Sequence, residues 1–192
     1  MKKTIKTKVA IATLIIAGLL AASLSLASAT PSTPVSGRWV PVGGTAIFSN
    51  LKIAGANVFV DVYNKGTYTT GDILGSFEQD FTAVLHYGDP EIAQNIEQIP
   101  IPQRPEADFG WSKMDRVFTG TVLGVSGGFT MRLEAKGYGN QLRGPSYYDL
   151  EGTWVIISGT GGLANLHGQG TWWHTRTGFG GLEYEGQIHF DP

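Results

Sequence analysis

The feature that most constrains the fold of this chain is the two-residue period of its apolar side chains. The pattern is clearest in residues 129–136, where every second residue is apolar and those between are polar. The apolar members are Phe129, Met131, Leu133 and Ala135. Successive side chains of a β-strand point to opposite faces, so this period predicts strands with one buried face. The same period recurs from Arg38 onward and predicts an all-β fold.

The strands predicted in this way are mostly joined by short links. They cover residues 46–53, 57–63, 67–70, 73–87, 116–125, 129–136, 152–158, 168–175 and 182–190. Residues 64–66 are expected to form a turn. An open sheet of this size exposes two edges, which closure removes. We therefore expect an eight-stranded antiparallel β-barrel, whose interior has room for side chains or one small ligand. A sandwich of two sheets is the alternative.

Residues 88–116 interrupt the alternating pattern. Asp89 is suited to cap a short helix that begins with Pro90, because an Asp side chain accepts backbone N–H groups and proline fits the first helical position. Three further prolines exclude both a helix interior and a central strand. They are Pro100, Pro102 and Pro105. The segment is therefore expected to be a long loop inserted between two strands, and loops of this length often cover an edge or an opening.

The first 29 residues have the three parts of a secretory signal peptide. Four lysines precede an apolar stretch from Val9 to Leu20, and residues 27–29 (Ala-Ser-Ala) fit the cleavage rule. An uncleaved membrane anchor is the alternative, because the apolar stretch is nearly long enough to span a bilayer. We expect cleavage after Ala29, a flexible linker over residues 30–36, and one barrel domain over residues 37–192. The mature protein would then be periplasmic or extracellular, without stable insertion in a membrane.

Charge and cysteine content narrow the possible partners. Fourteen basic residues include the four lysines of the leader, and there are 16 acidic residues, so the part after residue 29 carries a net charge of −6. This balance argues against nucleic acid and anionic membrane surfaces as partners. The chain contains no cysteine, which excludes disulfides, thiolate metal sites and cysteine nucleophiles.

Residues 152–171, GTWVIISGTGGLANLHGQGT, resemble the signature of a bacterial and archaeal family of uncharacterised proteins. The fold of that family is similar to the allene oxide cyclase barrel, which dirigent proteins share. Residues 118–129 and 184–192 resemble the family as well, whereas residues 88–116 do not. The resemblance implies an eight-stranded antiparallel barrel with an apolar lumen. It implies no activity, and no residue here matches a catalytic motif of the plant cyclases.

Large aromatic side chains are the best candidates for a ligand site, because they can line a pocket for a flat apolar molecule. The candidate ligand-binding residues are Phe77, Phe81, Trp154, Trp172, Tyr184 and Phe190. Glu78 and His189 are candidates for polar groups in the lumen. These rings could instead simply fill the barrel, as is usual for small barrels.

Three functions follow from this pattern. The first is a binding module that holds a small apolar molecule in the aromatic lumen. The second is an isomerase or cyclase that acts by shape, with proton transfer by Glu78, Tyr184 or His189. The third is a structural or surface protein with a packed barrel. The binding module is the favoured interpretation over an enzyme, and no catalytic residue can be assigned.

No metal or cofactor is expected from the motifs. The four histidines lack the close spacing of metal ligands. They are His86, His167, His174 and His189. Residues 159–164, GTGGLA, formally fit a dinucleotide-binding pattern, but the residues that follow cannot open the helix this chemistry needs, so a turn is predicted. The carboxylate pairs Glu78/Asp80 and Glu183/Glu185 are expected on the solvated outer face.

Overall fold

The computed structural model describes residues 31–42, 46–139, 148–174 and 181–192. Its elements are β1 (Thr33–Pro41), β2 (Ile47–Ala54), β3 (Asn57–Gly71), β4 (Ile73–His86), α2 (Pro90–Asn95), the 3₁₀ turn η1 (Ile101–Gln103), β5 (Ala107–Val122), β6 (Val125–Gly139), β7 (Tyr148–Gly161), β8 (Leu166–His174) and β9 (Leu182–Phe190). All of them belong to the unit Ser32–Pro192. The predicted leader lies outside the described residues. No helix in the described ranges is long and apolar enough to cross a bilayer.

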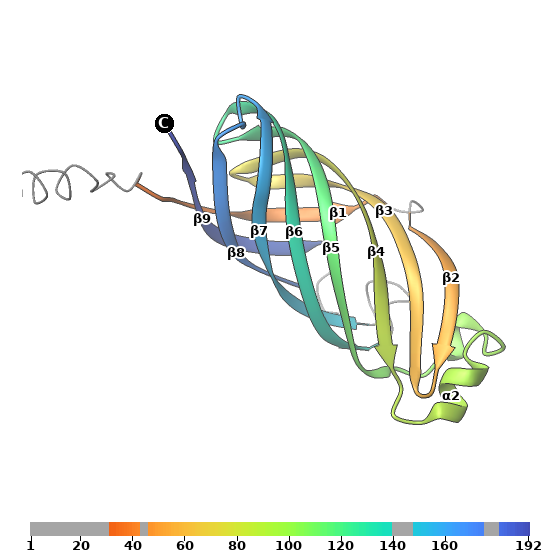
Figure 1. Cartoon of the computed structure of the whole chain (residues 1–192). Coiled ribbons are helices and arrows are strands. Elements are labelled where there is room, and N and C mark those ends of the chain that lie inside the picture. The colour runs from red at the N-terminus through yellow and green to blue at the C-terminus, as the bar shows by residue number, and fades with distance from the viewer. Residues whose placement is uncertain (1–30, 43–45, 140–147, 175–180) are drawn as a thin grey trace, which may run out of the picture. The chain divides into compact units, whose positions relative to one another are not determined.

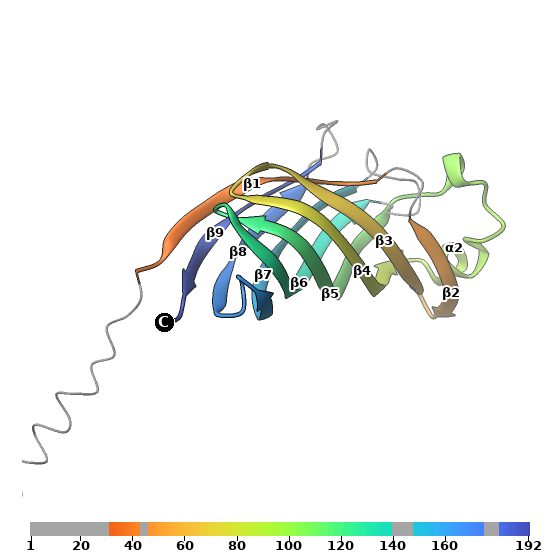
Figure 2. The ribbon, with the colours of Figure 1, turned by 90° about the horizontal axis from the view of Figure 1, so that it is seen from above.

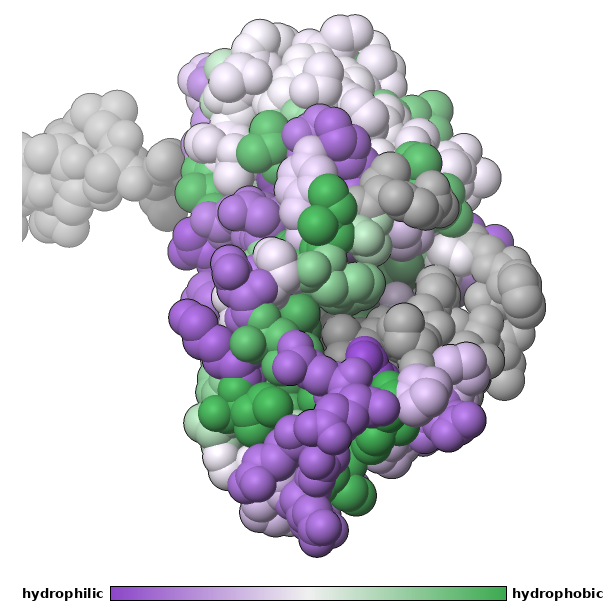
Figure 3. All heavy atoms as spheres, turned by 90° about the vertical axis from the view of Figure 1, so that its right-hand side faces the viewer, coloured by the Kyte–Doolittle hydropathy of each residue, from purple (hydrophilic) through white to green (hydrophobic). Residues whose placement is uncertain are grey.

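Eight strands form a closed antiparallel ring, as the sequence predicts. The order is β1-β9-β8-β7-β6-β5-β4-β3, and β3 pairs back with β1 (Figures 1 and 2). Strand β3 is shared between two neighbours, since residues 66–71 pair with β1 whereas residues 57–63 pair with β2. Strand β2 is therefore a ninth strand outside the ring. Seen from the side of β2 and α2, hydrophilic and hydrophobic residues alternate over the surface (Figure 3).

The barrel interior holds one main hydrophobic cluster. Its buried members come from all eight strands of the ring and from the link between β7 and β8: Val35, Trp39, Tyr68, Ile73, Phe77, Met114, Phe118, Val122, Phe129, Met131, Leu133, Ala135, Trp154, Ile156, Leu163, Leu166, Trp172, Leu182, Tyr184 and Ile188. They occupy every second position of their strands, which is why the two-residue period identified the core.

A second cluster lies where α2 packs against the strands. Its buried members are Val58, Val60, Val62, Ala83, Leu85, Tyr87, Ala93, Ile96 and Ala107. Val58, Val60 and Val62 share the inward parity of Tyr68 along β3. The segment between β4 and β5 therefore covers the inner face of the sheet where β3 extends past β1. This is the inserted Pro-containing loop that the sequence predicts, and Asp89 caps its helix as expected.

Three predicted boundaries were wrong. The inserted segment ends at Glu106 rather than at residue 116, because β5 begins at Ala107. The expected linker overlaps β1, which begins at Thr33 and buries Val35. Pro34 is tolerated there because residues 33–36 have a strand neighbour on one side only, β9. The expected turn at residues 64–66 is continuous strand. Gly66 is required not by a turn but by the Phe77 ring, which would overlap a side chain at that position.

Candidate functional site

The most unusual residue in the barrel interior is Arg116. It lies in the middle of β5 between the inward residues Met114 and Phe118, and its exposed fraction is 0%. Arginine is rarely buried without an ionic partner, because removing a charge from water is costly. Its environment therefore decides what this part of the interior can bind.

Two neutral groups accept hydrogen bonds from Arg116. Nε donates to Oε1 of Gln79 at 2.7 Å, and Nη1 donates to the hydroxyl of Tyr68 at 2.8 Å. The remaining nitrogen, Nη2, is buried and has no hydrogen-bond partner within the described residues. A guanidinium carries five N–H donors, and Arg116 uses two of them in hydrogen bonds to the described residues.

Aromatic rings enclose the charged group. The central carbon of the guanidinium lies 3.8 Å from the ring centroid of Trp39 and 3.9 Å from that of Phe77. The Tyr68 ring lies at 5.6 Å. The negative faces of such rings attract a cation, and each contact is worth about 0.5–2 kcal/mol. The rings thus offset part of the cost of burial.

No carboxylate neutralises this charge in the described part of the chain. Asp115, the residue before Arg116, points outward and forms a two-pronged ion pair with Arg132 at 2.8 and 2.9 Å. Burial lowers the pKa of the Arg116 guanidinium, because desolvation disfavours its charged form. Arg116 is therefore a buried cation held by neutral partners and by π-faces.

Two further buried polar atoms lack a partner among the described residues, namely Oδ1 of Asn64 and Nε1 of Trp172. Asn64 is the register partner of Gln79, which is in turn the partner of Arg116. These three residues form one polar row across the inner face of β3, β4 and β5. The row crosses an interior that is otherwise mostly apolar.

Part of the inner wall has only small side chains. Successive register partners on β4, β5, β6 and β7 are Ala83, Ser112, Ala135 and Gly152. The buried ring of Trp172, on β8, is the next partner of Gly152. These four positions therefore contribute little side-chain volume to the inner wall.

The aromatic residues predicted for the site do lie on the inner face. Phe77, Trp154, Trp172 and Tyr184 are buried in the main cluster, and Phe81 and Phe190 pack against it partly buried. The Trp154 ring lies over Gly170 and Gly186, where a side chain would collide with it. Its Nε1 donates to the carbonyls of Thr171 and Glu185 at 3.1 and 3.2 Å. These contacts hold the Trp154 ring against β8 and β9 on the inner face of the barrel.

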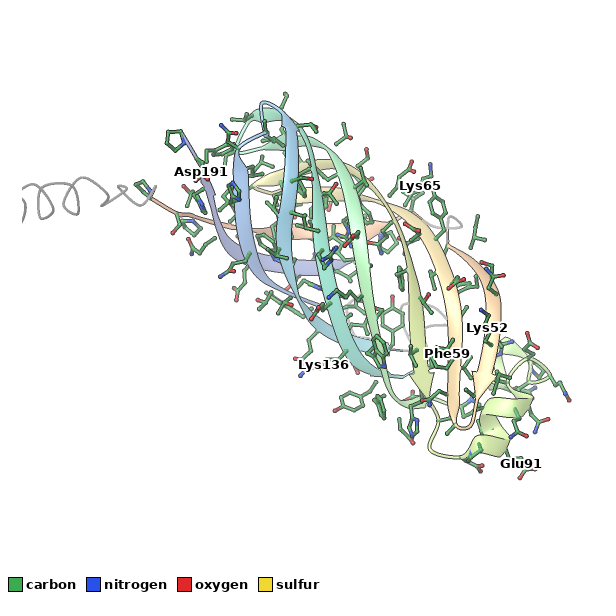
Figure 4. All side chains as sticks on the ribbon, viewed as in Figure 1. Lys52, Phe59, Lys65, Glu91, Lys136 and Asp191 are labelled. Carbon is green, nitrogen blue, oxygen red and sulfur yellow. The ribbon has the colours of Figure 1, made fainter. Side chains whose placement is uncertain are left out.

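Glu78 and His189 were wrongly predicted to reach the lumen, because both occupy outward positions between inward neighbours. Glu78 binds Lys65, labelled in Figure 4, at 2.6 Å and accepts from the Tyr63 hydroxyl at 3.0 Å. The hydrogen bond from Lys65 is the main cause that lowers the pKa of Glu78, so this group is a carboxylate rather than a proton donor. His189 stacks on His167 with centroids 5.3 Å apart, and its side chain is 38% exposed.

Arg116 and three of the residues that contact its guanidinium were not predicted as site residues from the sequence. These three are Trp39, Tyr68 and Gln79. One signal was present, since Arg116 shares the parity of Met114 and Phe118. A basic residue at an inward position of a strand is a candidate for a buried functional group.

Among the hollows on the surface that the structure describes, two are larger than the hollow of about 350 Å³ beside Tyr63 and Glu78. One, of about 970 Å³, lies over β6, β7, β8, β9 and β1 and has both polar and apolar walls, including Arg132, Gln169, Trp154 and Val155. The other, of about 440 Å³, is lined in part by the rings of Phe109, Trp111, Tyr138 and Trp173. In the described residues no three His, Asp or Glu side chains are grouped to hold a metal ion.

Comparison with known proteins gives a likeness of fold only. No protein-family model matches the chain, and neither does any curated protein. One similar solved structure is the crystal structure of a protein of unknown function from the DUF3224 family of Shewanella oneidensis MR-1. The TM-score is 0.56 with 13% sequence identity, over 84% of this chain and 99% of that one. At this identity the likeness supports a common architecture and carries no activity.

Proposed function

We propose that the barrel binds a small, largely apolar molecule in its interior. The observation that carries this proposal is the contrast within the inner wall. Aromatic rings from β1, β3, β4 and β8 lie in the main cluster, whereas a row of small residues crosses β4 to β7. Ligand sites in proteins are typically concave, apolar and furnished with a few polar groups, and the row of Asn64, Gln79 and Arg116 supplies such groups.

A packed barrel without a ligand is the second candidate, and ring contacts favour it. Trp39 packs edge-on against Phe77 with centroids 5.1 Å apart and lies 5.9 Å from Trp172. Such pairs add stability beyond the area that they bury. The two candidates differ in the role of the small residues. In a binding barrel these residues leave room for the ligand, whereas in a packed barrel they fit tightly against the aromatic rings.

Two adjacent substitutions test the choice. Ala135→Leu adds volume to the inner wall, whereas Lys136→Leu adds an apolar group at the next, outward position. The probe is Nile red, a neutral dye that fluoresces in apolar surroundings. We expect saturable binding to the wild type, several-fold weaker binding to Ala135→Leu, and wild-type binding to Lys136→Leu. If the barrel is packed, no variant binds the dye, and Ala135→Leu loses about 1–3 kcal/mol of stability through overpacking.

Catalysis as an isomerase or cyclase has less support. Of the three groups considered for proton transfer, Glu78 and His189 lie outside. The hydroxyl of Tyr184 is inside and already accepts a hydrogen bond from the backbone N–H of Ile73 at 3.0 Å. Burial raises the pKa of Tyr184, which makes it a weak acid.

We also propose export and a distant kinship with the allene oxide cyclase-like barrels. Both rest on the sequence: the leader in residues 1–29 and the signature in residues 152–171. N-terminal sequencing of the protein made by its native host tests export. A mature chain that begins at Thr30 supports it, and an intact Met1 in the cytoplasm contradicts it.

A further inference from the structure

We infer that the molecule bound in the interior carries a carboxylate, which Arg116 receives through Nη2. The inference rests on the proposed function and specifies the chemical class of the ligand. Its basis is a fully buried guanidinium whose two described hydrogen-bond partners, Gln79 and Tyr68, are neutral. Nη2 has no partner in the part of the chain that the structure describes.

The need for a counter-charge follows from burial. A cation in a low-dielectric interior is stabilised far more by an anion than by neutral dipoles. The outer face of this barrel pairs its cations with carboxylates, as in Arg38–Glu183, Lys113–Glu134 and Arg132–Asp115. On the inner face, Arg116 has no such partner among the described residues. Its orphaned nitrogen is the group that an arriving carboxylate would contact, since guanidinium N–H groups match carboxylate oxygens in geometry.

The count of charges indicates a monoanion. The buried polar or charged residues among those described are Gln79, Ser112, Arg116 and His174. Arg116 thus supplies one permanent positive charge. A carboxylate neutralises that charge, whereas a doubly charged phosphate would leave a net negative charge in an apolar interior.

The side chains around Arg116 also indicate the chemical character of the part of the ligand beyond the carboxylate. The rings of Trp39 and Phe77 lie within 3.9 Å of the guanidinium carbon. Any group that reaches Nη2 inside the main cluster is therefore surrounded by aromatic and aliphatic side chains. An apolar body attached to the carboxylate matches these walls, and a strongly hydrated one does not.

The test is a matched pair of probes that differ only in charge. 2-Naphthylacetate and 2-(2-naphthyl)ethanol share one carbon skeleton, and calorimetry gives the affinity of each. We expect the acid to bind the wild type about 30-fold more tightly than the alcohol, as is usual for a buried charge pair. Arg116→Met should abolish this ratio while the affinity for the alcohol stays within a few-fold. Arg132→Gln, which removes a surface arginine on the adjacent strand, should keep the ratio.

Each other outcome has a defined meaning. Equal affinities for the acid and the alcohol would overturn the inference that the ligand carries a carboxylate, but would not contradict the proposed function. Failure of both probes and of Nile red overturns the proposed function as well. A ratio that survives in Arg116→Met assigns the anion to another group and overturns the role of Arg116. If Arg116→Met does not fold, Arg116→Lys replaces it: lysine keeps the charge but lacks the planar fork, so the ratio should fall without vanishing.

Discussion

At the scale of the residue, burial in the barrel strongly alters the chemistry of Tyr184. Its ring is buried beside Tyr68, and its hydroxyl accepts the backbone N–H of Ile73 at 3.0 Å. Burial, the main cause, raises the pKa of its phenol well above the ordinary value. The folded state therefore keeps this proton at a pH where an unfolded tyrosine releases it.

The sign of the resulting pH dependence is fixed. The stability linked to Tyr184 is fully present below the unfolded pKa of about 10 and decreases as the pH rises above it. We expect the free energy of unfolding to fall between pH 9 and pH 11, and to fall less in Tyr184→Phe. Urea unfolding at both pH values measures this. Tyr138→Phe is the control, because Tyr138 is 66% exposed, and a matching reduction of the slope in that variant would contradict the assignment.

Arg116 gives a second prediction at this scale, on stability rather than binding. Arg116→Met removes an uncompensated buried charge together with two hydrogen bonds. Because these effects oppose each other, we expect the free energy of unfolding to stay within about 1 kcal/mol of the wild type. Tyr68→Phe keeps the charge and removes an acceptor, so it should cost more, about 1.5–3 kcal/mol. Urea unfolding compares them, and a loss above about 4 kcal/mol in Arg116→Met would make Arg116 a structural residue instead.

At the scale of the element, α2 depends on its first residues. The Asp89 side chain accepts the backbone N–H of Glu91 at 2.8 Å, and Pro90 opens the helix. Ala93 and the C-cap residue Ile96, both fully buried, attach the helix to the second cluster. We expect Asp89→Ala to lower the free energy of unfolding by about 1 kcal/mol and Asp89→Ser to leave it nearly unchanged. Thermal unfolding measures both variants. If Asp89→Ala and Asp89→Ser lower the free energy of unfolding equally, the predicted role of the capping hydrogen bond is contradicted.

The elements also show what the sequence could predict. Strand β6 was evident, because its inward residues are all apolar. The first half of β5 was not, because its inward positions include Gly110 and Ser112 while Phe109 and Trp111 face outward. Around residues 109–112 the large apolar side chains point outward, so the two-residue period predicts the wrong buried face. Aromatic residues of the candidate site could be found by parity, as Phe77 and Trp172 were.

The arrangement around Arg116 could not be predicted from the sequence. It joins Trp39 of β1, Tyr68 of β3 and Gln79 of β4 to a residue of β5. These groups meet only once the register of three ladders is fixed and the ring is closed. A two-residue period states which face a side chain occupies, but not which residue of a distant strand it will meet.

At the scale of the whole molecule, the ladders of the ring are unequal in length. The β1–β3 ladder has five register pairs in the described residues and shifts register between Arg38 and Trp39, whereas the β4–β5 ladder has 14 pairs. Local opening follows the weakest cooperative unit. We expect amide hydrogens of residues 37–41 and 66–71 to exchange before those of residues 129–135, as measured by native-state hydrogen exchange. Uniform exchange around the ring would contradict this order.

The β1–β3 ladder, which closes the ring of strands, also holds two of the aromatic rings that pack on Arg116. Trp39 and Tyr68 are register partners across it, and both contact Arg116. Parting β1 from β3 would draw these two rings from the guanidinium while the long ladders from β4 to β7 stay intact. Opening of this short ladder would therefore expose the buried cation to solvent without global unfolding of the barrel.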